Sequence, residues 1–163
     1  MAGTLLNRRT RRAIESAYKK VGNSSGPCME KDECLNSCCT HDVPMMYVEF
    51  AYLIDFLNNK LPEKEVKEML AKEPVPQELS MTGEKYCLIL GENGCMAYPA
   101  RPYRCRIYIR DEEMGLCRPL KAHEVAHGPR RILTKLNLGS GIPDELTKVE
   151  KSLGFWTNMF LDI

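Results

Sequence analysis

Apolar side chains recur at intervals of three and four in two long stretches of the chain, and this spacing predicts amphipathic helices. The first stretch covers residues 4–21, where the intervening positions are mostly arginine and lysine. The second covers residues 45–61, whose apolar stripe is expected to be core. The two stripes contain Leu6, Ala13, Ile14, Ala17, Tyr18 and Val21, and then Met46, Phe50, Leu53, Ile54, Leu57 and Leu61.

Two further helices are predicted, one after the second stripe and one at the end of the chain. Residues 62–73 begin with Pro62 and carry opposite charges four positions apart, which is typical of a short surface helix. In residues 142–160, Pro143 suits a helix start and Gly154 weakens the middle. The apolar stripe of this last helix contains Ile142, Leu146, Val149, Leu153, Trp156 and Phe160.

The segment KYCLILGENGCMAY, residues 85–98, predicts a small β-hairpin, because apolar runs flank the turn pair Asn93-Gly94. The expected fold is mainly α, a single domain over residues 1–163 with a cysteine-rich irregular metal-binding centre and this hairpin. Its parts are a basic N-terminal helix (1–22), a cysteine-cluster metal-binding region (28–117) and a C-terminal helical region (118–163).

Composition and charge are those of an ordinary globular protein. The chain has 163 residues, of which 44% are hydrophobic and 28% charged, and its net charge is +1. No apolar run is long enough to span a membrane, and no apolar stretch follows the RRTRR segment at residues 8–12, so neither a membrane span nor export is expected. We expect a cytoplasmic protein with a redox or other protein partner, and no nucleic-acid partner.

The chain contains eight cysteines in two groups. In a reducing compartment, clustered cysteines indicate metal ligands or redox groups more than structural disulfides. All eight are therefore candidate metal ligands, and His41 beside the adjacent pair is a further candidate. The first group contains Cys28, Cys34, Cys38 and Cys39, and the second contains Cys87, Cys95, Cys105 and Cys117.

Neither group has the spacing of a ferredoxin or a zinc finger, so the identity of the metal stays open. An iron–sulfur cluster is the first hypothesis, since adjacent cysteines suit a polynuclear site better than one tetrahedral ion. A zinc-binding structural or interaction module, or a site for an iron ion, is the alternative. In either case metal binding is expected to supply part of the folding free energy.

Three arginines surround Cys105 in the segment CMAYPARPYRCRIY: Arg101, Arg104 and Arg106. A cluster held by four thiolates is a net anion, and burying it requires compensating charge and hydrogen bonds. The arginines are therefore expected to support the metal centre from outside its ligand shell. Surface solvation, or ion pairs with acids such as Glu49, is the alternative interpretation.

The second cysteine group resembles a signature of the YkgJ-type cysteine-cluster proteins, a family described as a zinc- or iron-chelating domain. That signature has cysteines separated by a short turn, followed by Y-x-x-R-P-x-x-C-R and an aromatic residue. In this chain the matching positions are Cys87, Leu90, Cys95, Tyr98, Arg101, Pro102, Cys105, Arg106 and Tyr108. Cys28, Cys34, Cys38, Cys39 and Glu49 resemble the opening signature, and the resemblance implies metal chelation by residues 28–117.

A different motif, HEVAH at residues 123–127, matches the H-E-x-x-H pattern of zinc hydrolases. On a helix, His123 and His127 would share one face for zinc, with Glu124 as general base. Pro119 and Gly128-Pro129 confine such a helix to about two turns. The hydrolase is therefore the weaker alternative to a thiolate centre.

Overall fold

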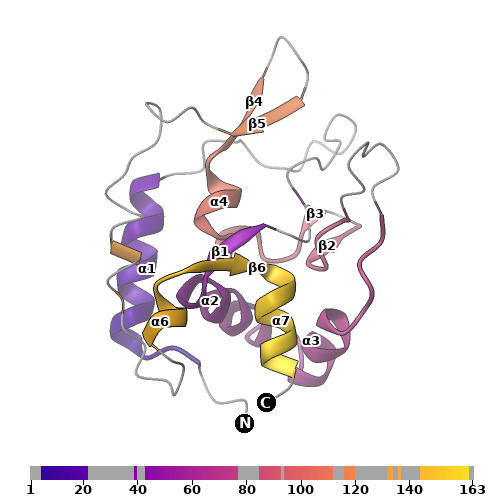
Figure 1. The fold of residues 1–163 in the computed structure, drawn as a ribbon, viewed down its shortest axis with the longest axis horizontal. Helices are drawn as coiled ribbons and strands as arrows, with labels where there is room; N and C mark the ends of the chain where they lie inside the picture. The colour runs from indigo at the N-terminus through magenta and orange to yellow at the C-terminus, as the bar shows by residue number, and fades with distance from the viewer. Residues whose placement is uncertain are drawn as a thin grey trace.

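Helices dominate the part of the chain that the computed structural model describes, and three small antiparallel sheets join them (Figure 1). The described residues are 5–21, 39, 43–76, 85–92, 94–111, 116–119, 132–133, 136 and 144–161, with backbone alone for 108–111, 116–119, 144 and 147. The elements are α1 (Arg8–Val21), β1 (Pro44–Met46), α2 (Tyr47–Asn58), α3 (Glu63–Leu70), β2 (Leu90–Gly91), β3 (Gly94–Cys95), the 3₁₀ turn η1 (Tyr98–Ala100), α4 (Tyr103–Arg106), β4 (Tyr108–Asp111), β5 (Leu116–Pro119), α6 (Asp144–Thr147), β6 (Glu150–Ser152) and α7 (Leu153–Leu161).

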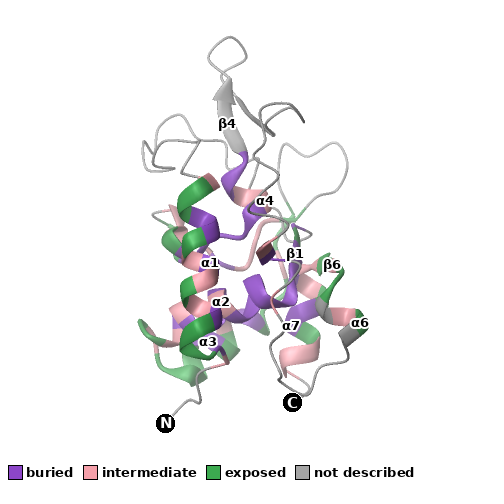
Figure 2. Cartoon of the chain, turned by 90° about the vertical axis from the view of Figure 1, so that its left-hand side faces the viewer, coloured by how far each residue is buried: buried purple, intermediate pink, exposed green. Residues whose placement is uncertain are grey.

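Helix α2 forms the centre of the core, as its apolar stripe predicts. Met46, Phe50, Leu53, Ile54 and Leu57 are all buried, and Figure 2 shows the helix surrounded by other elements. It contacts α1, α3, α6, α7 and η1. Each large apolar side chain buried here contributes about 1.5–3 kcal/mol of hydrophobic stabilisation, so this one helix holds the surrounding elements together.

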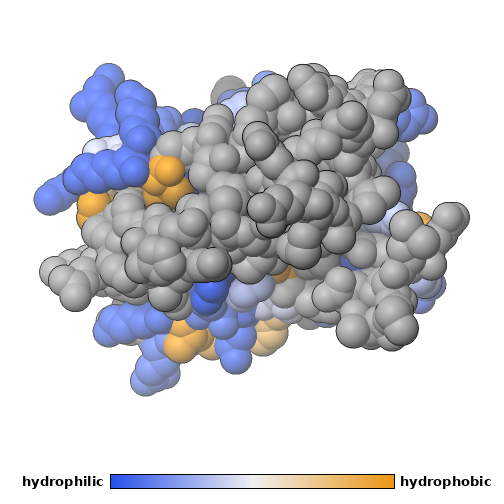
Figure 3. Space-filling model, turned by 90° about the horizontal axis from the view of Figure 1, so that it is seen from above, coloured by the Kyte–Doolittle hydropathy of each residue, from blue (hydrophilic) through white to orange (hydrophobic). Residues whose placement is uncertain are grey.

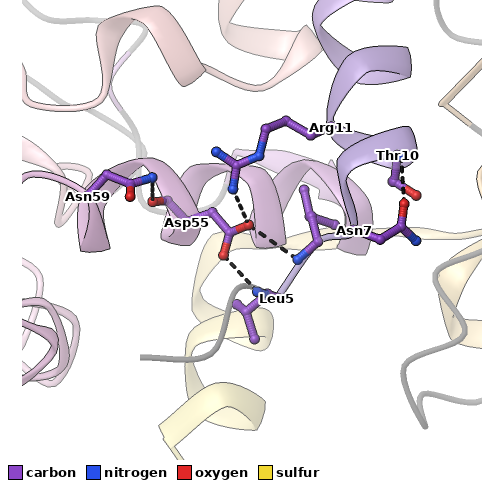
Figure 4. A network of polar contacts seen from close by, with 7 residues as sticks. Leu5, Asn7, Thr10, Arg11, Asp55 and Asn59 are labelled. Atoms are coloured by element: carbon purple, nitrogen blue, oxygen red, sulfur yellow. Dashed lines mark hydrogen bonds and ion pairs between the residues drawn. The ribbon is translucent and has the colours of Figure 1, made fainter. Parts of the chain in front are cut away.

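Helix α1 buries the predicted face and exposes its basic one. Leu6, Ile14, Ala17 and Tyr18 are buried, and the helix packs on α2. Its N-terminal end is held by an acid from α2 (Figure 4). The Asp55 carboxylate accepts hydrogen bonds from the backbone N–H groups of residues 5 and 6, at 2.8 and 3.2 Å, and forms an ion pair with Arg11 at 2.9 Å.

The predicted continuous helix over residues 142–160 is wrong, because a strand interrupts it. Helix α6 ends at Thr147, and β6 then pairs antiparallel with β1, so that Pro44 lies opposite Ser152. The chain re-enters a helix at α7, where the Trp156 indole N–H donates to the Met45 carbonyl at 2.9 Å. Pairing with β1 satisfies backbone groups that a helix would otherwise have satisfied locally.

The predicted hairpin is confirmed, and a second one is present that the sequence did not indicate. Strands β2 and β3 pair so that Leu90 lies opposite Cys95, and Gly94 has the positive φ, 98°, that its turn requires. Strands β4 and β5 form the second hairpin, which projects from the body at the top of Figure 1. Within the described residues, no helix is both long and apolar enough to cross a membrane.

Candidate metal centre

One residue from each cysteine group lies beside the other in the structure. The backbone N–H of Cys87 donates a hydrogen bond to the carbonyl of Cys39 at 2.8 Å. The Cys87 carbonyl in turn accepts from the N–H of Leu90 at 3.0 Å, which closes a turn leading into the first hairpin. Residues 48 positions apart in the sequence are therefore neighbours at the base of this hairpin.

The hairpin and the short helix α4 carry the other two cysteines whose side chains are described. Cys95 lies in β3 opposite Leu90. Cys105 lies in α4, where its N–H donates to the Pro102 carbonyl at 3.0 Å. The four cysteines are half-buried, and those at 87, 95 and 105 pack against the edge of the apolar core. They are neither locked inside the core nor displayed on an open surface, a position that suits ligands at the edge of a folded body.

The remaining candidate ligands have no described side chains. Cys117 lies in β5 opposite Arg110, and only its backbone is described. Among the side chains that the structure does describe, no three histidine, cysteine, aspartate or glutamate residues form a group that could hold a metal ion. Cys28, Cys34, Cys38, His41, His123, Glu124 and His127 lie outside the described residues.

Two of the three arginines predicted to support the centre are buried. Arg101 and Arg106 expose only 4% and 5% of their surface. The Arg106 Nε donates to the Arg101 carbonyl at 2.8 Å, and its guanidinium lies 4.0 Å from the centre of the Tyr18 ring. The Arg101 guanidinium stacks at 3.6 Å on the Tyr98 ring. Burial lowers the pKa of Arg106, yet a guanidinium stays charged in proteins, so positive charge is fixed inside the fold beside Cys105.

Arg104 pairs with an acid from the sheet formed by β1 and β6. Its guanidinium forms an ion pair with Glu150 in β6 at 3.1 Å, and the arginine side chain is about one-third exposed. The alternative interpretation, pairing with an acid, therefore describes Arg104, although the acid is Glu150 and not Glu49. This pair ties α4 to the sheet formed by β1 and β6.

Glu49 connects α2 to both α1 and α4 from inside the core, where only 1% of its surface is exposed. Its carboxylate accepts from the Tyr18 hydroxyl at 3.1 Å, from the Tyr103 N–H at 2.6 Å and from the Met46 N–H at 2.9 Å. Burial raises the pKa of Glu49, and the three hydrogen bonds oppose that shift. The carboxylate fixes the start of α4, two residues before Cys105.

Tyr18 lies in the core, as the apolar stripe of α1 predicts, and its hydroxyl also bonds Glu49, which the stripe does not indicate. Burial, followed by the Glu49 carboxylate, raises the pKa of the Tyr18 hydroxyl well above its ordinary value, and a charge on Cys105 acts in the same direction. Tyr18 therefore lies within electrostatic reach of Cys105. The available signal was the pair of acids, Glu49 and Asp55, inside the otherwise apolar run of α2, since buried carboxylates require partners.

A groove of about 530 Å³ opens beside Cys87, between the end of α3 and the first hairpin. Its walls are mainly apolar and include Met69, Val75, Leu88 and Met96. Val75 and Met96 are among the large apolar side chains that the structure leaves exposed. The groove gives the Cys87 side of the centre an open approach from outside.

No family model, no curated protein and no solved structure matches this chain. The residues of the centre are therefore the basis for assigning a function.

Proposed function

We propose that this protein holds an iron–sulfur cluster through thiolates of its two cysteine groups and uses it to transfer or sense electrons. The hydrogen bond between Cys87 and Cys39 carries the proposal, because it brings the two groups together at one place. A turn closed by an i to i+3 bond keeps its end Cα atoms within about 7 Å, and residues paired across antiparallel strands lie about 5 Å apart. Cys95 therefore lies within about 12 Å of Cys87, since Leu90 ends that turn and pairs with Cys95.

The chemistry of the donors supports a soft metal. Each candidate ligand whose side chain is described, at positions 39, 87, 95 and 105, is a thiol. Sulfur donors select zinc, copper(I) and iron–sulfur clusters over magnesium or calcium, which require oxygen. The described thiols alone do not make a complete site, so the proposed ligand set also draws on the cysteines at 28, 34, 38 and 117.

The buried positive charge supports an anionic centre, such as a cluster held by four thiolates, beside these arginines. Arg101 and Arg106 lie on either side of Cys105 in the sequence, and both guanidinium groups are buried. Hydrogen bonds and charge around a cluster set its reduction potential. Cationic groups beside its thiolates would stabilise the reduced, more negative form and thereby raise that potential.

The experiment is metal analysis of anaerobically purified protein, together with the variants Cys87→Ser and Cys105→Ser. We expect iron and acid-labile sulfide in the wild type, with broad visible absorbance, and loss of both together with solubility in each variant. Val75→Ser is the matched control, because Val75 is 64% exposed beside the same groove and supplies no metal ligand.

The other possible results of the metal analysis would change or refute the proposal. Stoichiometric zinc in a colourless protein would replace the cluster with the zinc-module alternative. Full metal content in Cys105→Ser would remove that residue from the ligand set. A metal-free wild type that is rigidly folded, with every thiol titratable, would refute the proposal.

A further inference from the structure

The outer surface of α1 carries a cluster of five cations, which we call the basic face: Arg8, Arg9, Arg12, Lys19 and Lys20. All five are exposed, and so is Ser16 between them. At 3.6 residues per turn these six positions fall within an arc of about 120° and extend over about 18 Å of helix. The buried residues of α1, which include Ile14, Ala17 and Tyr18, occupy the opposite side. Hydrophilic side chains fringe the left side of Figure 3, the side on which Figure 1 places α1.

The charge of the basic face is not balanced within the described structure. None of its five cations is among the ion pairs of the described residues, whereas Arg11, which lies off this face, pairs with Asp55. Helix α1 holds six of the chain's 23 basic residues and one of its 22 acids. The rest of the chain therefore has four more acids than bases, and the molecule has a strong charge asymmetry.

The two cations at the start of the helix oppose its macrodipole, whereas Lys19 and Lys20 lie in the last turn, where positive charge favours the helix. The first turn of α1 contains no acid and begins with Arg8 and Arg9. Cations at this end oppose the positive pole of the helix macrodipole and destabilise the helix. Arginines that are exposed, unpaired within the described structure and unfavourable to the helix contribute little to the fold, so we look for their role in an anionic partner.

The composition of the face narrows the class of partner. Insertion into a membrane surface needs exposed apolar residues, and those of α1 are buried in the core. Binding of single-stranded nucleic acid uses exposed aromatic side chains, and the basic face has none. Since the chain outside α1 has four more acids than bases, an extended polyanion such as a duplex or a bilayer would meet net repulsion beyond the basic face. A compact acidic protein can contact the basic face alone.

The inner side of the same helix reaches the candidate metal centre. Tyr18 donates to Glu49 and lies under the guanidinium of Arg106, the residue that follows Cys105 in α4. A helix with its side chains is about 10–12 Å across. A protein bound on the basic face is therefore separated from this end of the centre by little more than the thickness of one helix.

We propose that the basic face docks a small acidic electron-carrier protein. This inference rests on the proposed function for its redox step, in which one electron passes from the reduced carrier to the oxidised cluster and the carrier is thereby oxidised. Complementary charge steers such encounters and weakens with added salt. The partner class follows from the exposed cations and from their distance to Cys105.

The experiment measures binding of the anaerobically purified full chain to a plant-type ferredoxin and to a flavodoxin, two acidic carriers used as probes. We compare Arg9→Glu/Arg12→Glu/Lys19→Glu with the control Lys60→Glu/Lys64→Glu/Lys72→Glu. The control makes the same change in net charge at exposed lysines within and beside α3. We expect saturable binding that weakens at least about tenfold in the first variant and less than about twofold in the control.

Several results would overturn the inference: no saturable binding of either carrier at low salt, or equal weakening in both variants. Tighter binding to a DNA duplex or to phosphatidylserine vesicles, lost in the same triple variant, would do so as well, because it would assign the basic face to another class of partner. Metal analysis separates the two proposals. Metal-free protein that still binds a carrier through α1 would remove the redox step but keep the docking surface.

Discussion

Replacement of Glu49 by glutamine changes one oxygen to an NH₂ group and tests the link between α2 and α4. The two carboxylate oxygens divide their contacts, with Oε1 receiving the Tyr18 hydroxyl and the Tyr103 N–H, and Oε2 receiving the Met46 N–H. A glutamine side chain has one acceptor oxygen. In either orientation of the amide, its NH₂ group faces a backbone N–H in a site that is 99% buried.

The loss of unfolding free energy follows from this meeting of two donors, the amide NH₂ group and a backbone N–H. A buried donor left without an acceptor costs about 1–3 kcal/mol, and the hydrogen bond it made is worth about 0.5–1.5 kcal/mol more. We therefore expect Glu49→Gln to lower the free energy of unfolding by about 1.5–4.5 kcal/mol. In a chain of this size the melting temperature falls by about 2–4 °C per kcal/mol, or about 3–18 °C in total.

The pH dependence gives a second test of the same contact. Burial raises the pKa of Glu49 in the folded protein. The folded state therefore holds this proton more tightly than the unfolded state does. The contribution to stability is complete below the ordinary carboxyl pKa and is lost as the pH rises through the raised value. The glutamine variant has no such loss, so the stability difference between the two proteins should narrow as the pH rises.

The assay is denaturant unfolding followed by the emission of Trp156, the one tryptophan of the chain, which is fully buried. Glu65→Gln in α3 is the control, because Glu65 is exposed and its replacement should change stability by less than about 0.5 kcal/mol. Equal stability of Glu49→Gln and wild type at every pH tested would refute the reasoning. A stability difference that widens with pH would refute the assigned direction of the pKa.

Two further substitutions test other contacts by thermal unfolding. Asp55→Asn should lower the free energy of unfolding by about 2–3 kcal/mol. Its amide has one acceptor oxygen, whereas in the carboxylate Oδ1 accepts from the Leu5 N–H and Oδ2 accepts from the Leu6 N–H and Arg11. No change would show that the carboxylate does not hold α1. Gly94→Ala should cost about 1–2 kcal/mol, since a φ of 98° strains any residue with a Cβ. The matched control is Gly91→Ala, whose Cβ would meet Cγ of the Met96 side chain at 3.1 Å. Equal effects of the two alanines would contradict the strain argument.

The helices and the hairpin that depend on residues within one segment could be predicted from the sequence. Helices α1, α2 and α3 follow from apolar stripes of helical period and from Pro62, which precedes α3. The first hairpin follows from one Asn-Gly pair. The tail could not be predicted in this way, because β6 pairs with β1 across more than a hundred residues. A periodicity read within one segment contains no information about a strand that lies so far away.

The candidate site also combines features that the sequence indicates with features that depend on contacts between distant segments. The sequence indicates two groups of clustered thiols as candidate ligands, and the structure joins them by the backbone hydrogen bond between Cys87 and Cys39. The burial of Arg101 and Arg106 could not be inferred, because arginine is ordinarily exposed. It depends on the stacking of each guanidinium on a tyrosine, and for Arg106 that ring comes from α1, far from it in the sequence.

These contacts also position helix α4, which carries Cys105. Helix α4 is fixed by the Glu49 carboxylate at its first residue and by the Arg106 guanidinium at its last, and neither contact involves sulfur. Cys105 is therefore placed by the core, whatever the thiols bind. The backbone hydrogen bond from Cys87 to Cys39 contributes about 0.5–1.5 kcal/mol to the approach of the two cysteine groups. In the proposed function, a bound metal would add to this bond by holding the first cysteine group against a second group that the core positions.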